Sequence, residues 1–363
     1  MENNSALEIF NLLKIKKNVV LSGAPGTGKS RLLNEVASLF MEENGTELTT
    51  TPKHNPSSPI PIPKAVPTST VNREVFRTVF HQNTKYREFV SGIVPSIGDD
   101  SGFHVMAGTL YKASEFAKGH DASLLIIDEI NRGPAVQIFG GSIVAIEMDK
   151  RLDDQGKPTR KTQFFEMQCP KSGEIVEYAL PSNLYILAAM NQADTSVEPM
   201  DVAFLRRWYP YKLKADHKVL LELFELDDLS TVPDVPITKA DVLKIAIAAW
   251  SEINHRIALG RGEEFQLGHG IFLTQDYTSL ESLDDSLNFV CELWALILAH
   301  VEEVFFGDIR GIAAVLNASE SDKTAPILLV ESYFADEPRV TIKFPNSINK
   351  NNIYNLYRSI LAK

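Results

Sequence analysis

The chain has 363 residues and a hydrophobic content of 44%, which together predict two or three domains with cores of their own. Its 36 Lys+Arg and 47 Asp+Glu residues give a net charge of −11, which argues against a broad nucleic-acid-binding surface but not against a local basic pore. Two cysteines far apart in sequence exclude a disulfide framework or zinc motif, and the lack of a signal-peptide pattern favours a cytoplasmic location.

The first predicted elements surround a glycine-rich loop. A short helix over residues 5–14 precedes a buried strand, Val19 to Leu21. After the loop, apolar residues recur at helical spacing from Arg31 to Phe40. The loop therefore joins a strand to a helix.

The loop itself fits the pattern G-x-x-x-x-G-K-[ST] of a phosphate-binding loop. Glycines let several backbone N–H groups converge on one anion, and the start of the following helix adds partial positive charge. Lys29 is expected to reach the outer phosphates, and the Ser30 hydroxyl to bind Mg²⁺. The alternative, an ordinary glycine-rich turn, is disfavoured by the flanking strand and helix. The predicted nucleotide contacts are Gly23, Ala24, Pro25, Gly26, Thr27, Gly28, Lys29, Ser30 and Arg31.

A low-complexity stretch over residues 45–72 contains six prolines, which predict an extended loop inserted in the first domain. We interpret it as a tolerated insertion rather than a docking site for a partner. A strand is expected at residues 75–80, followed by a turn and a short helix ended by Pro95. A further short insertion then leads to a helix that ends near Lys118.

The unbroken apolar run at residues 123–128 predicts a buried strand that ends in two carboxylates. Asp128 is suited to hold Mg²⁺ through water. Glu129 is suited to polarise a water molecule for attack on a γ-phosphate. A strand that runs into a solvated acidic turn is the alternative. We favour the catalytic interpretation because a phosphate loop lies about 100 residues earlier.

The next segments complete the predicted sheet. One helix is expected over residues 134–148, and a β-hairpin lies in the insert 150–182, with arms at 164–167 and 174–179. Another buried strand, residues 184–191, ends at Asn191, whose amide could orient the attacking water or contact the γ-phosphate. A simple asparagine turn is the alternative, but strand ends in such sheets form the ligand crevice.

Two adjacent arginines, Arg206 and Arg207, follow on a short helix before a last strand, residues 209–213. Paired arginines on a surface helix are usually solvated. Phosphoryl transfer, however, needs a fixed cation, and either arginine is suited to act as an arginine finger, supplied by a neighbouring subunit. The alternation of strands and helices to this point predicts a mostly parallel α/β sheet over residues 1–213.

Helical periodicity dominates after residue 213 and predicts a helical domain over residues 214–306. It includes FVCELWALILAH, which is interrupted by Glu292, is too short to cross a membrane and is expected to be a core helix. We therefore expect no membrane association. The remaining residues, 307–363, are expected to form a C-terminal extension with a weak strand, PRVTIKF, and a final helix, NNIYNLYRSIL.

Five segments carry a family resemblance: GAPGTGKS, FHQNTKYREFVSGIVP, LLIIDEINRG, AAMNQADTS and FLRRW. Their order resembles that of AAA+ NTPases, and over about residues 18–275 the chain resembles the McrB branch, the motor subunits of modification-dependent restriction systems. The helix insert near residues 91–110 and the hairpin resemble features of the larger clade that includes MoxR-like and dynein-related ATPases. FQLGHGIF resembles a lid segment of that branch, with Gly270 where a serine is usual.

The resemblance implies an AAA+ P-loop core with a parallel sheet flanked by helices, followed by a helical lid and a small C-terminal extension. It implies a hexameric ring with nucleotide between subunits. By this resemblance Lys29 and Ser30 bind phosphates and Mg²⁺, Asp128 and Glu129 form the Walker B pair, Asn191 is sensor 1, Arg206 or Arg207 is the finger acting in trans, and His269 lies near the nucleotide.

The function expected is a Mg²⁺-dependent ATP- or GTP-driven ring motor for a separate nuclease or effector subunit that restricts foreign or phage DNA. The absence of N-K-x-D excludes only the small-GTPase mode of guanine binding. No nuclease pattern is visible, and the phosphate loop begins near the N-terminus, so we expect DNA recognition and cleavage to come from another subunit. Two alternatives stay open: a MoxR-like chaperone that remodels a protein partner, and a small-molecule kinase, which needs neither an arginine in trans nor a lid.

Overall fold

The computed structural model describes residues 2–42, 71–96, 102–118, 121–193, 200–230, 232–273 and 276–362. The chain forms two compact units. Unit 1 consists of residues 1–22 and 29–212, and unit 2 of residues 23–28 and 213–363. The glycine-rich loop, Gly23 to Gly28, therefore makes most of its contacts within the C-terminal unit, although its flanking strand and helix belong to unit 1.

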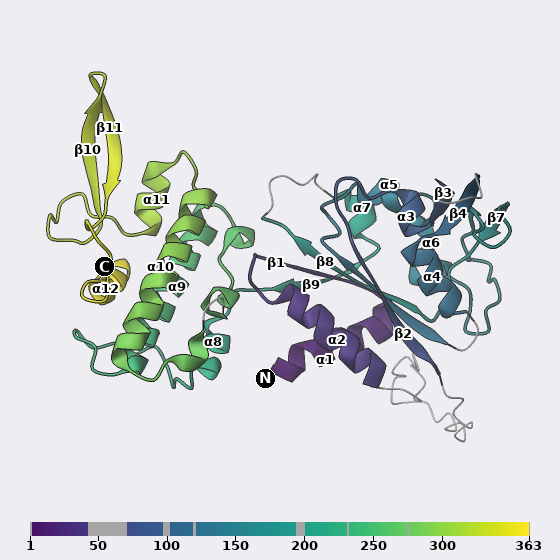
Figure 1. Ribbon diagram of the computed structural model, residues 1–363, viewed down its shortest axis with the longest axis horizontal. Helices are drawn as coiled ribbons and strands as arrows, with labels where there is room; N and C mark the ends of the chain where they lie inside the picture. Colours follow the sequence, from purple (N-terminus) through teal and green to yellow (C-terminus); the bar gives the residue numbers. More distant parts are fainter. Residues whose placement is uncertain are drawn as a thin grey trace, which may run out of the picture. The chain divides into compact units, whose positions relative to one another are not determined.

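Unit 1 is built on a five-stranded sheet with the strand order β2-β5-β8-β1-β9 (Figure 1). β2 pairs in parallel with β5, and β5 pairs in parallel with β8. The parallel α/β core predicted from the sequence is confirmed. The strands are β1 (Asn18–Gly23), β2 (Arg73–Val79), β5 (Ala122–Asp128), β8 (Leu184–Asn191) and β9 (Tyr209–Leu213).

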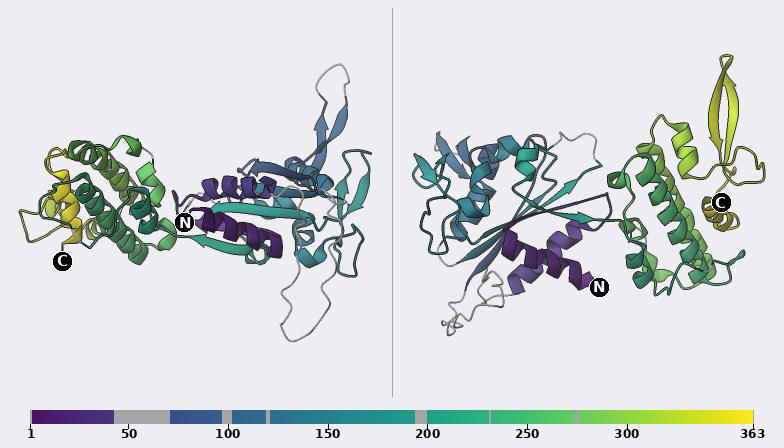
Figure 2. Two further views of the ribbon diagram at one scale, coloured as in Figure 1. Left: turned by 90° about the horizontal axis from the view of Figure 1, so that it is seen from below. Right: turned by 180° about the vertical axis from the view of Figure 1, so that it is seen from behind.

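Helices cover both faces of this sheet (Figures 1 and 2). α1 (Glu2–Lys16) and α2 (Lys29–Glu42) lie side by side on one face and contact β8. On the other face, aromatic rings fill the core, with Phe139 packed 4.7 Å from Phe89 and 5.1 Å from Phe204 between ring centroids. Burying one such ring contributes about 1.5–3 kcal/mol. The helices of that face are α3 (Tyr86–Phe89), α4 (Thr109–Phe116), α5 (Ala135–Phe139), α6 (Ser142–Ala145) and α7 (Val202–Leu205).

Two local predictions for unit 1 are wrong. The helix expected to end at Pro95 stops at Phe89, and β3 (Ser91–Pro95) then pairs antiparallel with β4 (Phe103–Ala107), so the insert expected to be a helix near residues 91–110 is largely a hairpin. The helix expected over residues 134–148 is divided into α5 and α6. It breaks at Gly140, where a Cβ atom would lie 2.7 Å from the ring of Tyr86.

The second predicted hairpin is present as β6 (Phe165–Gln168) and β7 (Ile175–Tyr178), which pair antiparallel. It is preceded by a short 3-10 helix, η1 (Met148–Lys150). The proline-rich loop expected at residues 45–72 lies outside the described residues, apart from its last two positions.

Unit 2 is centred on two long helices, α9 (Lys239–Gly260) and α10 (Leu283–Val304), which pack against each other. Each begins at a capping box, in which a hydroxyl and an aspartate satisfy the first backbone N–H groups: Thr238 with Asp241, and Ser282 with Asp285. Short elements complete its first half: α8 (His217–Leu223), η2 (Glu263–Phe265), η3 (His269–Leu273) and η4 (Tyr277–Ser279).

Residues 307–363 share the core of unit 2. α12 (Ile353–Leu361) packs on α9 and α10, and the ring of Tyr357 lies 5.5 Å from that of Trp294. α11 (Ile309–Val315) also packs on α9. The weak strand predicted here is β11 (Glu337–Lys343), and it pairs with a strand missed in the sequence, β10 (Leu328–Phe334). Within the described ranges, no helix combines the length and apolar character needed to cross a bilayer.

Candidate functional site

In unit 1, polar residues gather where β5 and β8 end. Asp128 is the last residue of β5, and Asn191 is the last residue of the adjacent β8. The backbone N–H of Ile130 donates to the carbonyl of Ala189 at 2.9 Å, so the turn after β5 is held against β8. Because the two strands are parallel, Asp128 and Asn191 lie at the same edge of the sheet.

The turn that follows Asp128 has a defined and strained geometry. One oxygen of Asp128 accepts the backbone N–H of Glu129 at 3.0 Å. Glu129 has a φ of 52°, a left-handed conformation that costs a non-glycine residue about 1 kcal/mol. Its carboxylate lies 3.4 Å from the guanidinium of Arg132. Backbone strain of this kind is concentrated at functional sites.

Asn131 ties this turn to the end of β8. Its side chain is 8% exposed, and its amide nitrogen donates to the carbonyl of Asn191 at 2.8 Å. The side-chain oxygens of Asn131 and Asn191 are buried, and no residue in the described part of the chain donates a hydrogen bond to either. Buried acceptors of this kind are normally satisfied, so both are suited to accept from a water molecule or a ligand.

Lys29, the first residue of α2, belongs to the same site. Burial lowers the pKa of Lys29, while the negative charges of Glu129 and Asp128 raise it in part. The ammonium group therefore lies within electrostatic reach of both carboxylates. Unit 1 thus brings together four of the predicted site residues: Lys29, Asp128, Glu129 and Asn191. Ser30, beside Lys29, is exposed to solvent.

Arg31 turns toward its own helix. Its Nε lies 2.6 Å from a carboxylate oxygen of Glu35, one turn later in α2. Both side chains are partly exposed. The nucleotide contact expected of Arg31 stays a prediction.

The glycine-rich loop has the backbone expected of an anion-binding turn. Gly26 and Gly28 have φ values of 75° and 85°, which side chains rarely adopt. The hydroxyl of Thr27 donates to the carbonyl of Ala24 at 2.8 Å and closes the turn. The Nε2 atom of His269 lies 4.0 Å from the position of a Cβ atom on Gly28, so this histidine lies beside the loop, within unit 2.

The two predicted arginines differ in their surroundings. Arg207 has a side chain only 6% exposed, and its Nε lies 3.0 Å from a carboxylate oxygen of Glu147. It also donates to the carbonyl of Ala203 one turn earlier. Arg206 is exposed, and its guanidinium makes no hydrogen bond or ion pair with the residues that the structure describes. Arg207 is therefore held within unit 1, whereas the side chain of Arg206 is exposed.

Comparisons with known proteins match the part of the chain that holds most of these residues. The family model of the AAA domain, dynein-related subfamily, matches residues 65–208, which include both carboxylates, Asn191 and both arginines. The EcoKMcrB subunit of a type IV methyl-directed restriction enzyme from Escherichia coli strain K12 is 28% identical over 202 residues, 55% of this chain. The chain contains an AAA domain of this subfamily and is similar to a McrB subunit. The family resemblance noted from the sequence is confirmed.

Another similar protein is the YdiS component of the type II restriction enzyme BsuMI from Bacillus subtilis strain 168, 29% identical over 217 residues, 57% of this chain. The matches cover 36% of the EcoKMcrB subunit and 60% of YdiS. A solved structure of NtrX from Brucella abortus matches 85% of this chain and 63% of its own, at 13% identity and a TM-score of 0.35.

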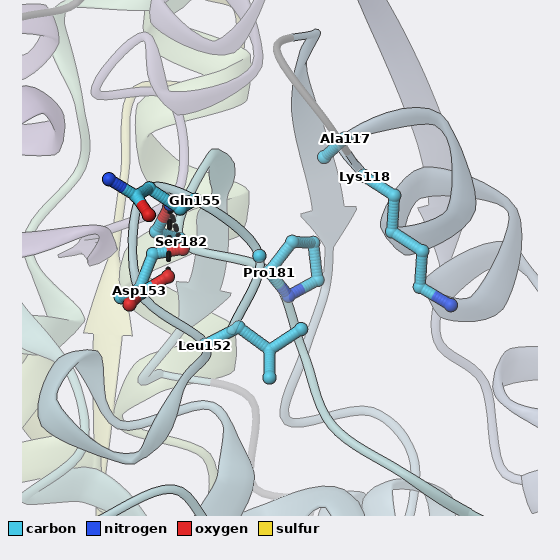
Figure 3. A pocket seen from close by; sticks show the side chains of 8 residues that line it. Ala117, Lys118, Leu152, Asp153, Gln155, Pro181 and Ser182 are labelled. Atoms are coloured by element: carbon cyan, nitrogen blue, oxygen red, sulfur yellow. Dashed lines mark hydrogen bonds between the residues drawn. The ribbon is translucent and has the colours of Figure 1, made fainter. Parts of the chain in front are cut away.

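A pocket elsewhere in the AAA+ core contains none of the predicted site residues (Figure 3). Its volume is about 410 Å³. Its lining comes from the residues after α4, the turn 152–156 after η1 and the residues just before β8, so it lies near the amino-terminal ends of β5 and β8. One carboxylate oxygen of Asp153 accepts hydrogen bonds from the backbone N–H groups of Gln155 and Lys157. This carboxylate therefore stabilises its own turn. The pocket is therefore separate from the edge where Asp128 lies.

Sequence reasoning missed Asn131 and Glu147. Asn131 stands within DEINR, but its neighbours Asp128 and Glu129 explained the polar turn without it. The one signal was its place directly after the apolar Ile130, where a polar side chain can be buried. Glu147 gave no such signal, because its pairing with Arg207 joins residues 60 positions apart.

Proposed function

We propose that this McrB-like protein is the nucleoside-triphosphate-hydrolysing motor of a restriction system, acting as a ring and driving a separate nuclease or effector subunit. The convergence of Lys29, Asp128, Glu129 and Asn191 at one edge of the sheet carries this proposal. The two similar proteins, both components of restriction enzymes, support the biological setting.

The proposed chemistry is hydrolysis of ATP or GTP. The backbone of the glycine-rich loop and the ammonium group of Lys29 bind the phosphates. Glu129 polarises the attacking water and takes its proton. The side-chain oxygen of Asn191, to which no described residue donates, accepts a hydrogen bond from that water and orients it. The strained turn at Glu129 fixes the carboxylate in advance of binding, which reduces the reorganisation needed in the transition state.

The residues present suit Mg²⁺. Ser30 offers an exposed hydroxyl and Asp128 a carboxylate, and Mg²⁺ usually takes one or two protein ligands with phosphate oxygens and waters as the others. Among the described residues no group of three or more His, Cys, Asp or Glu side chains forms a metal site by itself. When bound, the ion would neutralise the charge on the transferred phosphoryl group.

Arg206 is the proposed arginine finger, acting on nucleotide held by a neighbouring subunit. Its guanidinium is exposed and makes no hydrogen bond or ion pair with the described residues, which favours it over Arg207. If it acts in trans, turnover requires a second copy of the chain. An assembly of identical subunits in a closed ring satisfies that requirement at every interface.

Mixing two inactive variants tests action in trans. Glu129→Gln and Arg206→Ala subunits should each be inactive alone. Mixed in equal amounts, they should regain about a quarter of wild-type turnover, because one interface in four pairs an intact Glu129 with an intact Arg206. Mixing Glu129→Gln with Lys29→Ala is the matched control and should stay inactive, because Lys29 and Glu129 serve the same site. No recovery in the first mixture would refute action in trans.

The restriction role is tested with the product of the adjacent gene. ATP and GTP hydrolysis and cleavage of modified and unmodified DNA should be measured with and without that protein. We expect nucleotide-dependent cleavage only when both proteins are present. Nucleotide hydrolysis without cleavage, combined with remodelling of the partner protein, would favour the chaperone alternative.

A further inference from the structure

A short segment of unit 2, Leu267 to Gly270, lies directly against the glycine-rich loop, and we call it the lid segment. The backbone N–H of Gly268 donates to the carbonyl of Pro25 at 2.9 Å. The backbone N–H of Gly270 donates to the carbonyl of Gly26 at 2.8 Å. Two successive carbonyls of the loop are therefore held by the lid segment.

The lid segment approaches the loop too closely for any side chain at Gly268. A Cβ atom at that position would lie 2.1 Å from the carbonyl carbon of Gly26, a distance that real Cβ atoms essentially never show. At Gly270 a Cβ atom would lie 2.8 Å from the carbonyl oxygen of Gly26. This contact favours glycine at position 270 of this chain.

The long helices of unit 2 anchor the lid segment. Asn254 of α9 is 3% exposed and forms two hydrogen bonds with the backbone of Leu267: its oxygen accepts the N–H at 2.7 Å and its nitrogen donates to the carbonyl at 2.8 Å. The ring of His300 from α10 bonds the carbonyl of Phe265 at 2.8 Å. The lid segment is therefore fixed to α9 and α10 before it meets the loop.

A phosphate loop works only when its N–H groups, and not its carbonyls, face the anion. Each peptide unit of the loop can in principle rotate, and the glycines lower the barrier to such a rotation. A carbonyl turned toward the phosphates would repel them. Hydrogen bonds from Gly268 and Gly270 oppose that rotation at the two peptides after Pro25 and Gly26.

We infer that the lid segment is a positioning element that preorganises the glycine-rich loop for polyphosphate, with Gly268 and Gly270 as its contacts and Asn254 as its anchor. This inference rests on the proposed nucleotide-binding function. It assigns to α9 and α10 a direct effect on nucleotide affinity.

Three alanine variants test the inference: Gly268→Ala, Gly270→Ala and the matched control Gly102→Ala, where a Cβ atom meets nothing within 4 Å. The dissociation constants of ATP and GTP with Mg²⁺ and the steady-state parameters are measured for each. We expect Gly268→Ala to weaken binding by about tenfold or more, Gly270→Ala to weaken it less, and Gly102→Ala to match the wild type. KM should rise while kcat stays near the wild-type value, because the residues of unit 1 are unchanged.

Hydrogen exchange supplies a second readout. Peptides that cover residues 265–272 should show slowly exchanging amides at Gly268 and Gly270 in the wild type, and Gly268→Ala should lose that protection while α9 and α10 keep theirs. Equal nucleotide affinity in Gly268→Ala and the wild type would overturn the inference but leave the proposed function intact. Failure of the wild type itself to bind either nucleotide would overturn the proposed function. If Gly268→Ala does not fold, Gly270→Ala decides by the same affinity measurement.

Discussion

Replacing Arg206 and Arg207 one at a time by alanine should separate stability from catalysis. Arg207→Ala leaves the carboxylate of Glu147 without its cation in a partly buried place and removes the bond to Ala203. Breaking a fully buried ion pair costs about 3–5 kcal/mol. Because Glu147 is 27% exposed, water recovers part of that cost, and we expect a loss of about 2–4 kcal/mol.

The corresponding fall in melting temperature is about 5–15 °C for a unit of this size. Arg206→Ala removes an exposed side chain and should change stability by less than about 0.5 kcal/mol. Its nucleotide turnover should fall by about 10³-fold or more, because the transition state loses the cation that stabilises its charge. Thermal and urea unfolding, with ATP and GTP hydrolysis measured on the same preparations, distinguish the two effects.

A double-mutant cycle tests the pair directly. Glu147→Gln and Arg207→Ala should together destabilise the protein by less than the sum of the single changes, since both remove one interaction. Additive losses would show that the pair contributes nothing. If Arg206→Ala retained wild-type turnover, or if Arg207→Ala retained wild-type stability, the assignment of the two roles would be refuted.

Three further changes give distinct outcomes. Glu129→Gln should keep nucleotide affinity and lower kcat by about 10²-fold or more, measured by binding and hydrolysis together. Asn131→Ala should lower kcat by about tenfold with little change in nucleotide affinity, because Asn191 at the end of β8 loses the hydrogen bond that holds it. Asn351→Ala, at an exposed position in unit 2, is the control. Glu115→Gln should make the free energy of unfolding depend less on pH at acidic pH. Burial raises the pKa of Glu115, but hydrogen bonds from Lys118, Lys171 and Tyr178 outweigh it and hold that pKa at about 2.

The sign for Glu115 follows from that lowered pKa. Its contribution is complete above the ordinary pKa near 4.5 and is lost as the pH falls through about 2. Allowing for partial exposure, it amounts to about 1–2 kcal/mol. Equal acid sensitivity in wild type and variant would contradict this. An unchanged kcat in Asn131→Ala, or a full loss of binding in Glu129→Gln, would contradict the roles given to those residues.

The strands that form the sheet could be predicted from sequence because each is an unbroken or nearly unbroken apolar run. Residues 184–191 are buried at every position except the last, and that exception, Asn191, marked the site. The Lys29 loop and the Asp128–Glu129 pair were equally visible, because their chemistry depends on residue type and spacing. Features that depend only on local sequence can therefore be predicted without knowing the tertiary contacts.

What the sequence did not reveal depends on contacts between distant segments. The break between α5 and α6 lies where Gly140 meets the ring of Tyr86, and the internal role of Arg207 depends on Glu147. β10 was missed because its apolar and polar residues alternate only weakly. It is stabilised by pairing with β11, which the sequence of β10 alone does not show. The contact of the lid segment with the loop joins residues more than 200 positions apart, which no local pattern encodes.

Equilibrium binding of magnesium ATP and magnesium GTP to the wild type and to Lys29→Ala tests the central claim most directly. We predict that the wild type binds at least one of the two with a dissociation constant between about 1 μM and 1 mM, and that Lys29→Ala weakens that binding by about 100-fold or more. Equal binding by the two proteins, or no binding by the folded wild type, would contradict the account.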